Sequence, residues 1–233
     1  MKLSSPIFKL KRQAKVLARQ EGIRLHEALD RLAIAEGFRS WSHLAAAQPE
    51  PRPAQSILKE ISPGEMCLIA ARPGQGKTLL GLELAARAAE IGRQGYFFTL
   101  DFNAADIGAC YRTLGIEPRA VIVDTSDDIS AQHIVEKLDG ADRHALVVID
   151  YLQLLDQKRS NPDLATQIGM LRAHSRSTGR AVFVIAQVDR RFDESGKAMP
   201  DITDIRLPNP LDLSLFDRAC FLHAGHIHVQ AAA

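Results

Sequence analysis

Six short apolar runs, separated by segments of helix length, occupy the chain from residue 64 onward. Most of these runs are continuously apolar and do not alternate with polar residues, which is typical of strands that are buried on both faces. Strands of this kind alternating with helices predict an α/β domain with a mainly parallel central sheet. The predicted strands are 66–70, 96–100, 120–124, 145–150, 181–186 and 219–223, and the predicted helices are 77–91, 103–115, 129–138 and 163–178.

The first 48 residues follow a different pattern, which predicts a small all-helical unit. Apolar residues recur there at helical spacing, and the periodic segments end at Gly22 and Gly37. Ser40 is expected to cap a third, short helix. The P-E-P-R-P run at 49–53 favours an extended, stiff linker over a helix. The predicted parts are a small basic helical unit at 1–48, a proline-rich linker at 49–56 and the α/β domain at 57–233.

Positive charge is concentrated in the helical unit. The whole chain has a net charge of only +1, but residues 1–48 hold nine lysines and arginines against four acids, so the remainder carries −4. The large domain is therefore not expected to bind polyanions over its whole surface. In the first predicted helix, Lys11, Arg12, Lys15 and Arg19 lie opposite the apolar face. We expect them to contact nucleic acid or an acidic partner, with a solvated helix face as the alternative.

Composition limits the class of protein. No apolar run approaches the roughly 18 residues of a membrane span, and the N-terminus has no apolar signal core, so we expect a cytoplasmic protein without membrane partners. The three cysteines, Cys67, Cys110 and Cys220, are far apart and set among apolar or small residues. They are interpreted as buried thiols, since their spacing does not fit a disulfide framework or a metal site.

The stretch A-R-P-G-Q-G-K-T at 71–78 lies between a predicted strand and a predicted helix, which is the setting of a phosphate-binding loop. Gly74 and Gly76 let successive backbone N–H groups point at phosphate oxygens, and the helix start adds its positive dipole end. Lys77 would reach the β- and γ-phosphates, and the Thr78 hydroxyl would bind Mg²⁺. The sequence thus predicts ATP and Mg²⁺ as cofactors. The residues expected to line the nucleotide are Arg72, Pro73, Gly74, Gln75, Gly76, Lys77, Thr78 and Leu79.

A second component of the site follows another buried strand. The run A-L-V-V-I-D ends in Asp150, at the carboxyl end of the strand, where α/β sheets place their ligand-binding groups. An aspartate in this position is often a turn residue or a helix cap. Because a phosphate loop precedes it in the chain, we expect Asp150 to bind Mg²⁺ through the water shell of the ion.

Three stretches together resemble a known family. They are R-P-G-Q-G-K-T, V-V-I-D-Y-L-Q-L-L at 147–155 and V-I-A-Q-V-D-R-R at 184–191, and D-Y-L-Q-L is the most specific part. Over about 57–223 the chain is similar to the RecA-like nucleotide-binding core of DnaB-type hexameric replicative helicases. The resemblance implies an Mg-dependent ATPase that acts in DNA replication or related DNA metabolism, with single-stranded DNA and further copies of the chain as partners.

The same resemblance assigns roles late in the domain. Gln187, at the end of its strand, would be the polar sensor that reports the state of the γ-phosphate to the following loop. That loop, 188–206, would lie toward a central DNA channel with Arg190, Arg191 and Lys197. From the residues alone, the arginines fit a solvated loop equally well.

Two departures from the family pattern concern hydrolysis. The family usually has a glutamate after the second strand as general base, whereas this chain offers Asp101, whose side chain is one methylene shorter, so slow hydrolysis is expected. The family also supplies an arginine finger late in the domain, worth about 10³ to 10⁵ in rate. No lysine or arginine follows Arg218 in this sequence, and Arg218 itself is not assigned that role.

Alternatives remain open at this point. His223, His226 and His228 form a cluster with no acidic or cysteine partner nearby, which is more typical of a solvated hairpin than of a metal site. For the function, the alternative is a nucleotide-gated DNA-binding or regulatory module without helicase activity. A small-molecule kinase would need an arginine-rich lid, and the loops at 157–163 and 189–197 are too short or too acidic for one.

Overall fold

The chain divides into two compact units, Met1–Arg52 and Pro53–Ala233, in the computed structural model. The structure describes residues 4–5, 7–47, 53–117, 120–155, 161–207 and 209–232. None of the helices in these ranges is long and apolar enough to cross a membrane.

The N-terminal unit consists of three helices around a small core. The helices are α1 (Ile7–Glu21), α2 (Leu25–Ala35) and α3 (Trp41–Ala47), and Gly22 follows α1 in the left-handed conformation. Leu10, Ala33 and Leu44 are buried together, with Phe38 and Trp41 packed against them. As predicted, the Ser40 hydroxyl caps α3, where it accepts a hydrogen bond of 3.2 Å from the N–H of His43.

A fourth helix, α4 (Pro53–Glu60), begins inside the predicted linker. The linker prediction is therefore wrong for residues 53–56, while residues 48–52 lie outside the described residues. Proline is well tolerated at the first position of a helix, because the N–H that it lacks would have no intrahelical acceptor there. Ala54, Ile57 and Leu58 of α4 are buried in the core of the larger unit, so this unit begins at Pro53 and not at 57.

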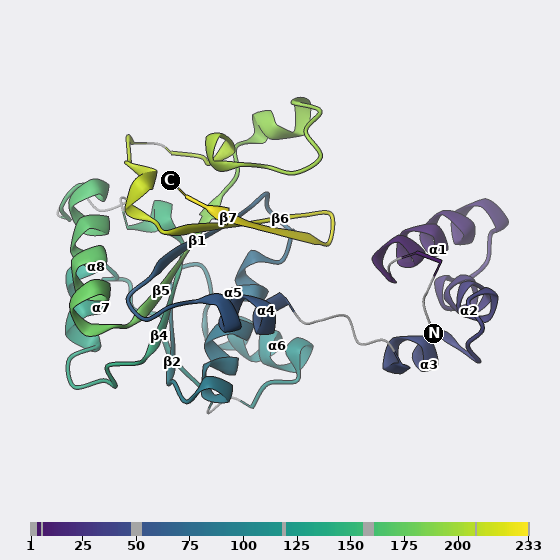
Figure 1. Ribbon diagram of the computed structural model, residues 1–233, viewed down its shortest axis with the longest axis horizontal. Helices are drawn as coiled ribbons and strands as arrows, with labels where there is room; N and C mark the ends of the chain where they lie inside the picture. The colour runs from purple at the N-terminus through teal and green to yellow at the C-terminus, as the bar shows by residue number, and fades with distance from the viewer. Residues whose placement is uncertain are drawn as a thin grey trace. The chain divides into compact units, whose positions relative to one another are not determined.

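The larger unit is built on a seven-stranded sheet with the order β3-β2-β4-β5-β1-β6-β7 (Figure 1). All neighbouring strands are parallel except the β6–β7 pair, which is an antiparallel hairpin. The predicted α/β class with a mainly parallel sheet is confirmed. The strands are β1 (Met66–Ala71), β2 (Gly95–Thr99), β3 (Val121–Asp124), β4 (Leu146–Asp150), β5 (Ala181–Gln187), β6 (Arg218–His223) and β7 (His226–Ala231).

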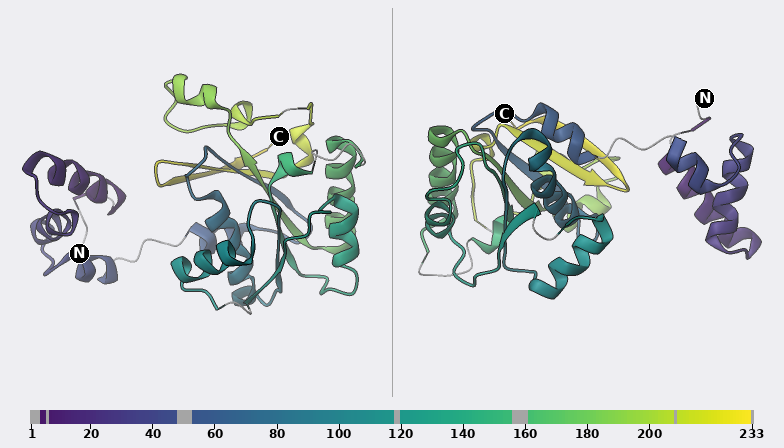
Figure 2. Two further views of the ribbon diagram at one scale, coloured as in Figure 1. Left: turned by 180° about the vertical axis from the view of Figure 1, so that it is seen from behind. Right: turned by 90° about the horizontal axis from the view of Figure 1, so that it is seen from below.

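Helices cover both faces of this sheet (Figures 1 and 2). Apolar side chains of α4, α5 and α6 pack in the core on one face, and those of α7 and α8 pack in the core on the other. The bounds are α5 (Lys77–Arg87), α6 (Ala104–Leu114), α7 (Ala131–Lys137) and α8 (Leu164–Thr178), with short 3-10 helices at Ala88–Ile91, Leu152–Leu154, Arg190–Glu194, Ile202–Asp204 and Leu213–Leu215.

Gly81 allows α5 to lie directly against the sheet. A Cβ atom at this position would stand 2.7 Å from Cδ1 of Ile185 and 3.0 Å from Cγ1 of Val148, both of which are too short for unstrained packing. The helix that follows the phosphate loop is thereby fixed over β4 and β5, whose carboxyl ends carry further candidate site residues.

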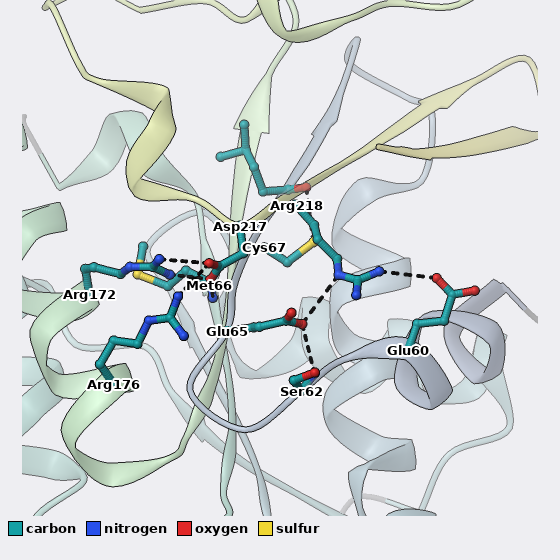
Figure 3. A network of polar contacts seen from close by, with 10 residues as sticks. Glu60, Ser62, Glu65, Met66, Cys67, Arg172, Arg176, Asp217 and Arg218 are labelled. Atoms are coloured by element: carbon teal, nitrogen blue, oxygen red, sulfur yellow. Dashed lines mark hydrogen bonds and ion pairs between the residues drawn. The ribbon is translucent and has the colours of Figure 1, made fainter. Parts of the chain in front are cut away.

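The amino ends of the parallel strands form one side of the sheet, called here the amino edge, and their carboxyl ends form the carboxyl edge. Ion pairs hold the amino edge (Figure 3). The Asp217 carboxylate accepts hydrogen bonds from the guanidinium groups of Arg172 and Arg176 on α8 and from the N–H of Met66 at the start of β1. Arg218 pairs with Glu60 at 3.5 Å and with Glu65 at 3.4 Å. Arg218 is therefore engaged at the edge of the sheet that lies away from the phosphate loop of its own chain.

Candidate functional site

The loop between β1 and α5 has the backbone form that anion binding needs. Gly74 and Gly76 have φ angles of 77° and 86°, which lie in the left-handed region where other residues are strained. A Cβ atom added at either glycine would meet no described atom within 4 Å, so backbone conformation and not space requires glycine. Gly76 is the N-cap of α5, and the unpaired N–H groups of the first helical turn face the loop.

Lys77, the first residue of α5, lies near the end of β4. Its Nζ atom is 5.9 Å from the centroid of the Tyr151 ring, close enough for a cation–π interaction. Tyr151 directly follows Asp150, so the D-Y-L-Q-L stretch brings an aromatic ring to the lysine and a carboxylate to the same site.

Asp150 is a buried carboxylate without a hydrogen-bond partner. The residue is 3% exposed, and neither carboxylate oxygen accepts a hydrogen bond within the part of the chain that the structure describes. Burial raises the pKa of Asp150 to about 6, nearby Thr78 and Lys77 lower it, and the charge of Asp101 raises it further. Thr78 thus lies close to the carboxylate, although its hydroxyl does not reach it in hydrogen-bond geometry. A buried polar group left unsatisfied in this way needs an explanation.

Asp101 and Thr99 lie at the end of β2, beside β4. Thr99 is fully buried and pairs with Asp150 in the register of the two strands. Asp101 is exposed, and its backbone N–H donates to the Thr99 hydroxyl at 3.3 Å. Since its charge raises the pKa of both Asp150 and Tyr151, Asp101 lies within electrostatic reach of both. Four residues proposed from the sequence, Lys77, Thr78, Asp101 and Asp150, therefore come together.

Gln187 lies at the end of β5, beside Ala71, the last residue of β1 before the phosphate loop. Its amide oxygen accepts a hydrogen bond of 3.4 Å from Nη1 of Arg206. Backbone hydrogen bonds from Asp189 to Asp204, at 2.7 Å, and from Arg206 to Gln187, at 2.8 Å, close the base of the segment 188–206. The end of β5 and the end of this segment are thus joined.

The side chain of Arg72 does not extend over the phosphate loop. It forms an ion pair of 2.9 Å with Asp193 and donates a hydrogen bond of 3.1 Å to the carbonyl of Val188. What remains in the loop is the backbone of Arg72.

Three residues near the site, Tyr151, Gln153 and Arg206, were not singled out from the sequence. For the first two, the D-Y-L-Q-L stretch carried the signal.

The residues predicted to contact DNA differ in whether they already form ion pairs within the chain. Arg190 is exposed, and Arg191 pairs with Asp189 at 3.1 Å. Lys197 pairs at 2.9 Å with both Asp201 and Asp204, which raises its pKa and neutralises much of its charge. In the N-terminal unit, three of the predicted contacts are exposed on α1, and the side chain of the fourth, Arg12, lies outside the described residues: the exposed ones are Lys11, Lys15 and Arg19.

A cavity of about 230 Å³ adjoins the loop at Gly76. Leu79, Leu80 and Glu83 of α5 form one wall, and the β6–β7 hairpin with Ile227 forms another. The Gln75 side chain connects the two walls, since its Oε1 atom accepts a hydrogen bond of 2.9 Å from the N–H of Ala224 in the hairpin turn. The cavity is therefore continuous with the phosphate loop and mainly apolar.

The three histidines of the hairpin lie on neighbouring strands. His223 contacts the Phe192 ring edge-on at 5.0 Å between centroids, and His226 and His228 are exposed on β7. Within the described ranges, no group of three or more His, Cys, Asp or Glu side chains is arranged to hold a metal ion. The sequence predicts six strands and a hairpin at 223–228; the structure has this hairpin and pairs its second strand with β6 as a seventh strand of the sheet, β7.

Comparison with known proteins supports the architecture. No protein-family model matches the chain. The replicative DNA helicase DnaB of Mycoplasma genitalium is 25% identical over 200 residues, which cover 69% of this chain and 42% of that protein. A solved structure described as an ATPase domain superposes with a TM-score of 0.55 at 20% identity, covering 78% of this chain and 80% of that one. A solved structure of a DnaB-like replicative helicase and its interactions with primase superposes with a TM-score of 0.55 at 18% identity. The match covers 92% of this chain and 66% of that one. The chain spans less than half the length of the curated relative, and its larger unit has the RecA-like fold of DnaB-type ATPase domains.

Proposed function

We propose that this protein binds ATP with Mg²⁺ at the loop 72–78, hydrolyses it, and acts in DNA replication or related DNA metabolism. The single observation that carries the proposal is the buried carboxylate of Asp150, which accepts no hydrogen bond from any described residue and lies beside Thr78 and Lys77, next to a loop with two left-handed glycines. Such a carboxylate is costly to bury unless a cation binds it. Single-stranded DNA and further copies of the chain are the proposed partners, by analogy with the helicases that it resembles.

The oxygen atoms at the site fit Mg²⁺. The ion prefers oxygen ligands and keeps several waters, so one hydroxyl and one carboxylate suffice on the protein side. Thr78 would hold the ion directly and Asp150 through its water shell. When bound, Mg²⁺ would supply positive charge to the β- and γ-phosphates.

The remaining residues would bind and orient the nucleotide. The backbone N–H groups of the loop would donate to phosphate oxygens, and Lys77, resting against the Tyr151 ring, would donate to the β- and γ-phosphates. The cavity beside Gly76 has apolar walls suited to a base, and Glu83 is a hydrogen-bond acceptor in its lining. We therefore place the base there.

Hydrolysis is proposed to be slow. The carboxylate after β2 is an aspartate, and its exposed side chain must activate water with a reach one methylene shorter than that of a glutamate. This favours a protein in which bound ATP persists and acts as a signal. A nucleotide-gated module without unwinding is thus the second candidate.

The experiment that tests the binding proposal compares Asp150→Ala with wild type by calorimetry, using a nonhydrolysable ATP analogue. In Mg²⁺ we expect about tenfold weaker binding, since one charge-assisted contact is lost, and with chelator we expect no difference. Asp139→Ala, an exposed carboxylate before β4, is the matched control. Equal weakening with and without the metal would mean that Asp150 has a structural role.

We further propose that the N-terminal unit contacts nucleic acid through the basic face of α1. The support is the excess of five positive charges in residues 1–48 and the exposure of Lys15 and Arg19. Reversing both charges to glutamate should weaken binding to single-stranded DNA and reduce the slope of log affinity against log salt by about 0.7 per lost contact. Arg39→Glu, outside α1, is the control. If the affinity for single-stranded DNA changes neither with salt nor with the charge reversal, the basic residues of α1 form a solvated helix face and not a binding site.

A further inference from the structure

A chain of hydrogen bonds joins the ends of β4 and β5 through one arginine. Nε2 of Gln153, just after β4, donates to the backbone carbonyl of Arg206 at 2.6 Å. The backbone N–H of Arg206 donates to the carbonyl of Gln187 at 2.8 Å, and its Nη1 atom donates to the Gln187 side-chain oxygen at 3.4 Å. Two glutamines therefore hold Arg206 by hydrogen bonds: Gln153 bonds its backbone carbonyl, and Gln187 bonds its backbone N–H and its guanidinium.

Arg206 is also close to the nucleotide site electrostatically. Burial and the charge of Asp101 raise the pKa of Tyr151, and the positive charge of Arg206 acts in the opposite direction. The same Tyr151 ring is 5.9 Å from Lys77 Nζ, and Arg206 contacts Gln187 at the end of β5, so both cations lie at the carboxyl ends of the strands, as the phosphate loop does.

The chemistry of the Arg206–Gln187 contact fixes the amide of Gln187. A guanidinium has five N–H donors and no acceptor, so only the amide oxygen can face it. If the amide rotated by half a turn, its N–H₂ group would meet the guanidinium donor to donor, without a hydrogen bond. The N–H₂ group is consequently left to donate to another acceptor. Gln187 lies beside Ala71, the last residue before the phosphate loop, so a phosphate bound at the loop would be an acceptor within this region.

We propose that Arg206 is a positioning residue for Gln187, which holds the side-chain oxygen so that the amide N–H₂ group faces the terminal phosphate of a bound triphosphate. This inference rests on the proposed function of the loop 72–78. Gln153 supports the arrangement from the D-Y-L-Q-L stretch. The same contacts close the base of the segment 188–206, where Val188 and Ile205 pair, so the amide of Gln187 and the start of that segment share one anchor.

The test is a double-mutant cycle on the preference for triphosphate over diphosphate. Affinities for a nonhydrolysable ATP analogue and for ADP, both with Mg²⁺, are measured by calorimetry for wild type, Arg206→Ala, Gln187→Ala and the double variant. Each single change should reduce the preference about tenfold, as for one oriented hydrogen bond to a charged group, and leave ADP binding unchanged. The double variant should be no worse than Gln187→Ala, because Arg206 acts through Gln187.

Two further variants complete the design. Arg206→Lys keeps a donor and the charge, so it should recover most of the lost preference. Arg143→Ala removes an exposed arginine before β4, at the other edge of the sheet, and should have no effect. If Arg206→Ala does not fold, Arg206→Met replaces it, since methionine keeps an unbranched side chain of similar length but has no hydrogen-bond donor.

The outcomes separate this inference from the proposed function. Additive losses in the double variant, or equal losses for ADP and the triphosphate analogue, would overturn the positioning role while the loop remains a nucleotide site. A wild-type chain that binds neither nucleotide would overturn both.

Discussion

Asp150 and Asp217 lie at opposite edges of the same sheet, and their environments are opposite as well. Asp217 follows no strand but precedes β6, and its carboxylate accepts hydrogen bonds from two arginines and a backbone N–H (Figure 3). Asp150 ends β4, is more deeply buried, and accepts none within the described parts of the chain. Burial raises the pKa of both carboxyls, but for Asp217 the hydrogen bonds and the charge of Arg172 outweigh it and lower the pKa.

The difference separates a carboxylate that stabilises the fold from one that we propose to bind a ligand. The three donors around Asp217 connect α8, β1 and β6, so its charge is compensated within the protein. Asp150 accepts no hydrogen bond from the described residues, and nearby Thr78 and Lys77 only partly offset the effect of its burial. A perturbed group in this setting is a candidate for function. The Asp217 carboxylate at the amino edge is thus paired within the folded chain, whereas we propose that a bound cation pairs with Asp150 at the carboxyl edge.

The largest expected difference between the two edges concerns nucleotide affinity. Lys77→Ala at the carboxyl edge should weaken ATP binding about a thousandfold, or about 4 kcal/mol, because the phosphates lose their main cationic contact. Arg176→Ala at the amino edge also removes a cation but should leave the affinity unchanged. Calorimetry with Mg²⁺ and the nonhydrolysable analogue measures both. Comparable losses in the two variants would remove the distinction between the edges.

The second prediction concerns the pH dependence of stability. The pKa of Asp150 is about 6 in the folded protein, against an ordinary value of 3.8 that applies in the unfolded chain. As pH falls, the folded state therefore binds this proton before the unfolded state does. Stability from this group should therefore rise by roughly 2 kcal/mol between pH 7 and pH 4, approach about 3 kcal/mol below pH 3.8, and be lost again as pH rises through 6.

Urea unfolding of wild type and Asp150→Asn across this range measures that contribution as the difference between the two pH profiles. Asp217 has a lowered pKa, so its contribution is present above 3.8 and is lost only at lower pH. The two windows do not overlap. Parallel profiles for wild type and Asp150→Asn would show that Asp150 does not titrate as proposed.

The third prediction is a loss of stability at the amino edge. Asp217→Asn removes the charge that binds Arg172 and Arg176 and should cost about 2 kcal/mol, between the values for exposed and buried ion pairs. At pH 7, Asp150→Asn should cost nothing or stabilise the chain, because the buried carboxylate that it replaces accepts no hydrogen bond from the described residues. Chemical denaturation at this pH compares the two, and a larger loss for Asp150→Asn would invert the comparison.

The smallest effect is expected in the rate of hydrolysis. Asp101→Glu lengthens the general base and should raise the ATPase rate about threefold, less than 1 kcal/mol in the barrier. Steady-state turnover at saturating ATP, with and without single-stranded DNA, measures it. A rate that falls in the Glu variant would show that the shorter side chain is fitted to this site.

Much of the fold could be predicted because both of its signals are local. Continuous apolar runs identify strands that are buried on two faces, and the glycines and lysine of the phosphate loop mark the turn between β1 and α5. The approach of Lys77, Thr78 and Asp150 then follows from topology, since the carboxyl ends of neighbouring parallel strands share one edge.

Other features depend on contacts between distant residues and have no local signal. Pro53 reads as part of a linker until Ala54 and Leu58 are seen to be buried against the domain. The side chain of Arg72 turns to Asp193, and Lys197 is held by two acids, which spacing along the chain does not reveal. β7 was not predicted as part of the sheet because an edge strand is half exposed and lacks a continuous apolar run.

The hairpin turn at Ala224 and Gly225 has positive φ angles at both residues, 51° and 81°. Alanine is a poor choice for the first of these positions, so this turn depends on its contact with Gln75 of the phosphate loop. The amide hydrogen of Ala224 should therefore exchange with solvent more slowly while that contact is formed. Its exchange rate is therefore a built-in reporter, about 150 residues away in the sequence, of how firmly the phosphate loop is held.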